Sequence, residues 1–213
     1  MKILELPPIL HVPTTWKVAI VTGLSDPTHC RLSATQLEFL NELRTATQQA
    51  LGHVEHGTFV ENNFPFVAIP DSPDTTQPSL FRASLNNSWQ YTICRRESYR
   101  KSAARHWQTL IQSTDRLLLI TGSCGLQLAT QGLWKNAAHS GEIEVLALGP
   151  VANRQLAEQL FRLTVVQGKR DWLSRRFCSA DVMIPGMRHL EYWSDKRVRK
   201  VATEWLLNRI SVS

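Results

Sequence analysis

Short runs of aliphatic residues that alternate with helical patterns constrain the fold of this chain more than any other feature. Buried parallel strands read as nearly continuous aliphatic stretches, because both faces of the sheet are covered. Four such runs, with a weaker fifth, lie at 18–22, 117–121, 143–148, 163–167 and 181–184. Helical patterns lie between and after them, at about 33–51, 99–113, 124–135, 152–161 and 195–208. This alternation predicts βα units around a mostly parallel sheet.

The chain is long enough to bury one sizeable core. Its 213 residues, of which 43% are hydrophobic, favour a single domain spanning 1–213. The polar, proline-containing stretch from about 70 to 88 predicts a long surface loop rather than a linker. We therefore expect an α/β three-layer sandwich. In open parallel sheets ligands bind beyond the carboxyl ends of the strands, so those ends are the places to search for function.

Cysteine usage and hydropathy suggest the compartment. The four cysteines form no CxxC pair, and the N-terminus lacks the charged and then apolar pattern of a signal peptide. No run approaches the ~18 apolar residues of a membrane span. We expect a soluble protein in a reducing, cytoplasmic setting, with no membrane span.

The net charge of +6 is concentrated in two segments. Residues 169–200 hold nine Lys or Arg against four Asp or Glu, and residues 95–105 hold five against one. The two segments therefore carry +5 and +4, which leaves the rest of the chain at −3. Such a distribution fits an anionic partner or substrate, and it equally fits a basic face that only keeps the protein soluble.

Three polar side chains stand at or just after the carboxyl ends of predicted strands. Ser123 follows 117–121, Asp171 follows 163–167, and His189 follows 181–184, and each has a glycine nearby. After 143–148 comes Gly149-Pro-Val-Ala-Asn153, which contains no acid. A nucleophile, an acid and a base in this chain order are what an α/β-hydrolase topology presents.

The sequence resembles the α/β-hydrolase superfamily over roughly residues 17–208. "VVQGKRDWLSR" (165–175) is similar to the strand, glycine and acid segment of that family, and "MIPGMRHLEYW" (183–193) to its strand, glycine and catalytic histidine. "AIVTGLSDP" (19–27) is similar to the oxyanion strand, with Thr22 in place of His. The resemblance implies an α/β-hydrolase fold and a triad of Ser123, Asp171 and His189.

The spacing of these residues implies a minimal version of the fold. From Ser123 to Asp171 is 48 residues, which leaves no room for an inserted lid domain. From Asp171 to His189 is only 18, so the helix usually found there must be absent or reduced to a turn near Arg175 to Phe177. Access to the site should therefore be open.

Two side chains compete for the nucleophile position, because Cys124 directly follows Ser123 and a thiol has the lower intrinsic pKa. The family pattern G-x-S-x-G centred on Ser123 places Gly125 where helix and strand must approach closely, and leaves Thr121 as the one departure. Centring on Cys124 would put Leu126 there instead. We favour Ser123. The resemblance then assigns the Leu24 and Cys124 backbone N–H groups to the oxyanion hole.

The function expected from the resemblance is a carboxylesterase or thioesterase that forms an acyl-enzyme on Ser123. It requires no metal and no organic cofactor, and we expect no nucleic-acid partner. Five basic residues near Asp171 and His189 suggest acyl-carrier-protein or acyl-CoA conjugates as substrates: Lys169, Arg170, Arg175, Arg176 and Arg188. The same residues could serve only solubility.

Other interpretations stay open at this point. Ser123 alone could be a helix N-cap, Asp171 a turn residue, and His189 a partly buried histidine beside Tyr192. "ITGSCGLQLA" also resembles a nucleotide-binding turn, although the GxGxxG spacing is missing. Thr22, Thr121 and the short Asp171 to His189 spacing further allow a catalytically inactive relative that acts as a binding or assembly subunit.

Overall fold

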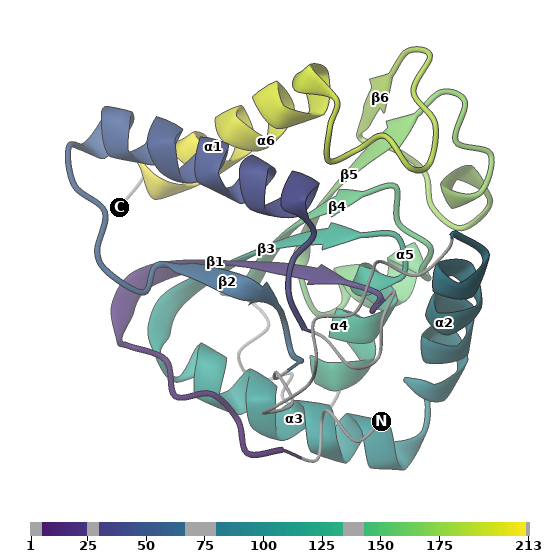
Figure 1. The fold of residues 1–213 in the computed structure, drawn as a ribbon, viewed down its shortest axis with the longest axis horizontal. Helices are drawn as coiled ribbons and strands as arrows, with labels where there is room; N and C mark the ends of the chain where they lie inside the picture. Colours follow the sequence, from purple (N-terminus) through teal and green to yellow (C-terminus); the bar gives the residue numbers. More distant parts are fainter. Residues whose placement is uncertain (1–5, 25–29, 67–79, 134–142, 212–213) are drawn as a thin grey trace.

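Six parallel strands form one sheet at the centre of the computed structural model, which describes residues 6–24, 30–66, 80–133 and 143–211 (Figure 1). The strand order is β2-β1-β3-β4-β5-β6, and each neighbouring pair is parallel. The strands are β1 (Thr14–Thr22), β2 (Phe59–Asn63), β3 (Thr114–Gly122), β4 (Ile143–Leu148), β5 (Arg162–Gly168) and β6 (Val182–Ile184). The predicted three-layer α/β architecture is confirmed.

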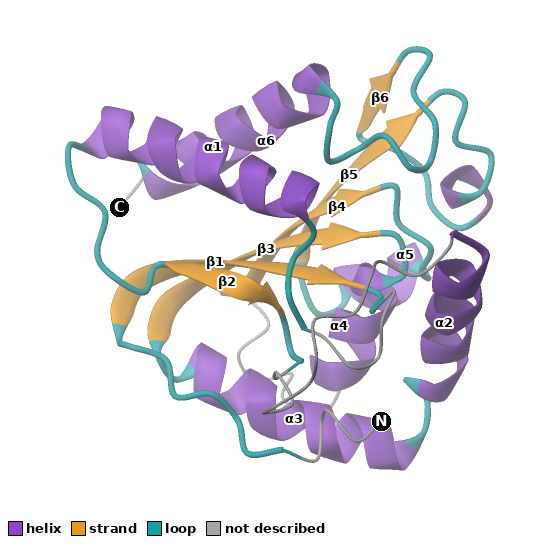
Figure 2. Ribbon diagram, in the orientation of Figure 1, coloured by secondary structure: helices purple, strands orange, loops and turns teal. Residues whose placement is uncertain are grey.

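Helices cover both faces of the sheet (Figure 2). One layer contains α1 (Ala34–Leu51) and α6 (Lys196–Ile210), and the other contains α3 (Glu97–Ile111) and α4 (Gly125–Leu133). The remaining helices are α2 (Leu80–Ile93) and α5 (Arg154–Glu158), with a short 3-10 turn, η3 (Ser174–Arg176). Within the described ranges, none of the helices has the length and hydrophobicity that crossing a bilayer requires.

The aliphatic run of β3 shows why a strand covered on both faces has no alternation. Leu117 and Leu119 pack into the core beneath α3 and α4, whereas Leu118 and Ile120 pack into the core beneath α1 and α6. Successive side chains of a strand point to opposite faces, so both sets must be apolar. β3 therefore runs through the middle of the molecule and is covered on both faces.

Three expectations about elements need correction. The strand β2 was not expected, because it is an edge strand with an exposed Glu61 and lacks an aliphatic run. The predicted loop at 70–88 is helical from Leu80 onward, since α2 is anchored by tertiary contacts such as the buried Gln90; residues 70–79 lie outside the described part. The helix expected at 152–161 is shorter, starting after its Asn153 cap. The turn expected near Arg175 is confirmed as η3.

Candidate active site

Ser123 lies on a sharp turn between β3 and α4. Its φ of 50° is in the left-handed region, which costs a residue with a Cβ roughly 1–3 kcal/mol. Two backbone hydrogen bonds hold it there: Ser123 N–H donates to Leu148 O (3.2 Å), and Val151 N–H donates to Ser123 O (2.9 Å). A strained strand-to-helix turn of this kind lifts its side chain above the end of the sheet.

Gly125 allows the helix after this turn to approach the sheet. A Cβ at Gly125 would lie 1.9 Å from Val21 O and 3.0 Å from the Thr22 Cα. No side chain fits in that space, so α4 packs its first turn directly on the backbone of β1. This close approach is the physical reason for the glycine two residues after the turn serine.

The three predicted polar side chains meet at the carboxyl end of the sheet. Ser123 Oγ lies 3.1 Å from His189 Nε2, and His189 Nδ1 lies 2.9 Å from Asp171 Oδ2. Asp171 is reached from β5 by a tight turn in which its N–H donates to Gly168 O (3.0 Å). The chain thus brings together residues 66 and 18 positions apart in a continuous hydrogen-bonded line.

Asp171 is buried and held as a carboxylate. Its side chain has no exposed surface. Burial opposes its charge, but hydrogen bonds from His189, Tyr192 and the Ser174 N–H outweigh that effect and lower its pKa to about 2. An ionised Asp171 accepts from His189 Nδ1–H, which leaves His189 Nε2 as the nitrogen that faces Ser123.

Tyr192 is a site residue that the sequence did not single out. Its hydroxyl donates to Asp171 Oδ2 (2.7 Å), the same oxygen that faces His189, and accepts from the Gly168 N–H (2.8 Å). Burial and the bond to Asp171 raise the pKa of Tyr192 well above its usual range. Its ring fills the space beside Gly149, where an added Cβ would lie 2.3 Å from Tyr192 Cε2. The only signal in the sequence was its position three residues after His189.

Cys124 is poorly suited to attack a substrate. It is only 3% exposed, and burial, followed by the nearby Cys94, raises the pKa of its thiol to about 12. A thiol that stays protonated is a weak nucleophile. Its backbone N–H has no hydrogen-bond acceptor among the described residues and lies one position after Ser123, where the sequence placed an oxyanion donor.

The second expected oxyanion donor needs correction. The Leu24 N–H is not free, because it donates to Gln90 Oε1 (2.7 Å) while Gln90 Nε2 donates back to Leu24 O (2.6 Å). Both Leu24 and Gln90 are buried, so this pair of bonds is shielded from water. The expectation failed because Gln90 belongs to α2, a helix that the sequence pattern did not predict.

A cavity of about 540 Å³ opens beside Ser123 and His189. It is formed mainly by α2, the turns after β1, β3 and β4, η3 and the segment after β6. Its described lining holds several large apolar or aromatic side chains and no Lys, Arg, Asp or Glu; the apolar ones are Leu148, Val151, Leu173, Phe177, Leu190, Tyr91, Tyr192 and Trp193. None of the five basic residues named from the sequence lines this cavity.

No group of three His, Cys, Asp or Glu side chains in the described part of the chain is arranged to hold a metal ion.

Solved structures share the architecture described above. A dienelactone hydrolase from Anabaena variabilis superposes with a TM-score of 0.56 at 13% identity, covering 92% of this chain and 88% of that one. A predicted CIB-like hydrolase from Thermoplasma acidophilum gives 0.52 at 13% identity over 91% and 86% of the two chains. An α/β hydrolase from a sediment metagenome of the Mar Chica lagoon, Morocco, gives 0.52 at 10% identity, covering 94% of each.

No protein-family model and no curated protein matches the sequence. The likeness to solved structures nevertheless extends over nine-tenths of the chain, and the described residues contain no lid domain. The chain has the α/β-hydrolase fold.

Proposed function

We propose that this protein is a serine hydrolase that cleaves carboxylic esters or thioesters through an acyl-enzyme on Ser123. The observation that carries the proposal is the line of hydrogen bonds from Ser123 Oγ through His189 to the buried Asp171. In such a triad the histidine must contact the nucleophile with one ring nitrogen and the acid with the other, and His189 contacts Ser123 and Asp171 in this way. The solved structures with this fold include proteins described as hydrolases, which supports the reaction class.

In the proposed reaction His189 Nε2 takes the proton of Ser123 as Oγ attacks the substrate carbonyl carbon. Asp171 holds the imidazole in orientation and stabilises its charged form. The bond from carbon to the leaving oxygen or sulfur then breaks, and His189 gives its proton to the leaving group. Water repeats the sequence: His189 takes its proton, the bond to Ser123 breaks, and the proton returns to Oγ.

The oxyanion would be held by the Cys124 N–H and by a side chain of α2. Because the Leu24 N–H is occupied, we assign the second donor to Asn87, which lines the cavity and lies against Gly23; an added Cβ on Gly23 would be 2.4 Å from Asn87 Oδ1. That oxygen is buried without a hydrogen-bond partner in the described structure. A rotation of the Asn87 amide by about 180° would exchange its oxygen and its NH₂ group and would leave the shape of the side chain unchanged. The NH₂ group would then occupy the position of that oxygen.

The occupied Leu24 N–H also favours one alternative, a catalytically inactive relative that serves as a binding or assembly subunit. A fluorophosphonate probe, which reacts covalently with activated serines, separates the two. The hydrolase proposal predicts stoichiometric labelling of the wild type and of Cys124→Ala, and none of Ser123→Ala. A folded wild type that does not label, or labelling that persists in Ser123→Ala, supports the inactive alternative and ends the hydrolase proposal.

A further inference from the structure

A second groove, of about 650 Å³, adjoins the cavity at Ser123. Tyr91 and Phe177 line both spaces, and their rings meet edge to face with centroids 6.2 Å apart. This pair of aromatic rings, one from α2 and one from the end of η3, is the boundary between the groove and the cavity. A ligand that passes over the pair would have one end at Ser123 and the other in the groove.

The two spaces differ sharply in charge. The described lining of the cavity contains no charged Lys, Arg, Asp or Glu, whereas the groove is lined by three arginines and one carboxylate, Glu158. Arg154 is already engaged, because it pairs with Glu158 (2.6 Å) and with Asp181 (2.9 Å). The positive charge of the groove therefore rests on Arg95 and Arg176.

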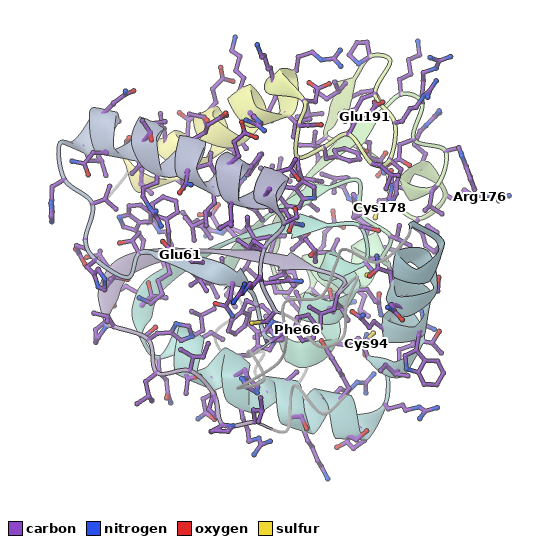
Figure 3. The ribbon with its side chains drawn as sticks, viewed as in Figure 1. Glu61, Phe66, Cys94, Arg176, Cys178 and Glu191 are labelled. Atoms are coloured by element: carbon purple, nitrogen blue, oxygen red, sulfur yellow. The ribbon has the colours of Figure 1, made fainter. Side chains whose placement is uncertain are left out.

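The guanidinium groups of these two arginines have N–H donors that make no hydrogen bond within the described part of the chain. Arg95 uses one guanidinium nitrogen to donate to the Tyr91 hydroxyl (3.1 Å), and its guanidinium lies over the Tyr91 ring (5.1 Å to the centroid). Arg176 has no side-chain partner among the described residues and points outward from the body of the molecule (Figure 3). Arginine binds phosphate with two parallel N–H bonds and with little loss of hydration, so such a pair selects phosphate over a neutral group.

We propose that this groove, defined by Arg95 and Arg176, binds the phosphate-bearing part of the leaving group. The inference rests on the proposed function and narrows it: the substrate is an uncharged acyl group joined to a phosphorylated alcohol or thiol. The acyl group occupies the neutral cavity, the chain of the leaving group crosses Tyr91 and Phe177, and the phosphate lies between the two guanidinium groups. Only Arg176, of the five basic residues that the sequence emphasised, belongs to this groove.

Kinetics with matched thioesters test the proposal. Butyryl-CoA carries phosphates on its leaving group, whereas butyryl-pantetheine has the same thioester and no phosphate. We expect the wild type to show a kcat/KM at least tenfold higher for butyryl-CoA, mainly through KM. The Arg95→Gln/Arg176→Gln double variant should lose this preference, and so should the wild type at high salt. A butyryl acyl carrier protein measured in parallel distinguishes a protein-borne phosphate from that of a small molecule.

Two controls make the result decisive. Arg162→Gln removes one charge, as Arg95→Gln or Arg176→Gln alone does, from an exposed residue at the opposite end of β5, and it should keep the preference. Binding of free CoA to Ser123→Ala, measured by calorimetry, should weaken at least tenfold when Arg95 and Arg176 are both replaced by Gln. Equal kcat/KM for both thioesters in a wild type that labels with fluorophosphonate overturns the groove alone. A wild type that neither labels nor hydrolyses any ester overturns the proposed function itself.

Discussion

Replacing Gly125 by alanine should lower both the stability of the fold and the rate of catalysis. The new Cβ would lie 1.9 Å from Val21 O, whereas an ordinary contact begins at 3.4 Å, so α4 must move away from β1 by about 1.5 Å. Overpacking of this kind costs about 1–3 kcal/mol of unfolding free energy. Ser123 is carried on the same turn, and a displacement of about 1 Å at a reacting group lowers the rate by about 100-fold.

The assay combines urea unfolding with kcat for a nitrophenyl ester and with the rate of fluorophosphonate labelling. Gly52→Ala is the matched control, since Gly52 has φ 76° and nothing within 4 Å of an added Cβ, far from the site. It should lose about 1 kcal/mol through backbone strain and keep its kcat. If Gly125→Ala retains more than half of the wild-type kcat, the close packing of α4 on β1 does not position Ser123, and the reasoning is wrong.

Three further outcomes follow from the contacts of the site. Tyr192→Phe removes the hydroxyl that bonds Asp171 and Gly168, so urea unfolding should show a loss of about 2–4 kcal/mol together with a lower kcat; an unchanged unfolding free energy would contradict this. The pKa of Asp171 falls on folding from 3.8 to about 2, so its ionised form stabilises the fold above pH 4 and loses that effect as the pH falls towards 2. The advantage of wild type over Asp171→Asn in unfolding free energy should therefore shrink by about 2 kcal/mol across that range, and a constant difference would refute the low pKa. Asn87→Ala should lower kcat by about 100-fold with little change in KM, whereas an unaltered kcat would remove Asn87 from the oxyanion site.

The sequence predicted the parts of the fold whose residues are buried on two sides. The aliphatic side chains of β3 and β4 point to both faces of the sheet, and at an edge or in water they would be exposed. Their pattern therefore indicates a central parallel strand that is buried on both faces. The edge strand β2 escaped prediction because Glu61 faces solvent and the strand needs no aliphatic run. Likewise the apolar residues of α2 do not form a clear stripe on one face, and its helix depends on tertiary contacts such as that of Gln90 with Leu24. A contact between residues 66 positions apart leaves no local pattern.

In the candidate site, too, the residues with a local sequence pattern could be predicted, and those that depend on distant contacts could not. Ser123, Asp171 and His189 could be named because each stands at a strand end, and the topology of a parallel sheet brings those ends to one edge. Tyr192 could not, since its role depends on the hydroxyl reaching Asp171 across a turn. The oxyanion expectation at Leu24 failed for the converse reason: the backbone position was correct, but a distant side chain occupies its N–H.

The nucleophile is the central claim, and a trapped acyl-enzyme tests it most directly. Wild-type protein is mixed with a nitrophenyl butyrate, quenched in acid during turnover, digested and mapped by mass spectrometry, with Ser123→Ala and Cys124→Ala treated in the same way. We predict a butyryl group on Ser123 in the wild type and in Cys124→Ala, and on no residue in Ser123→Ala. A butyryl group on Cys124, or turnover of the ester by Ser123→Ala at the wild-type rate, would contradict the account.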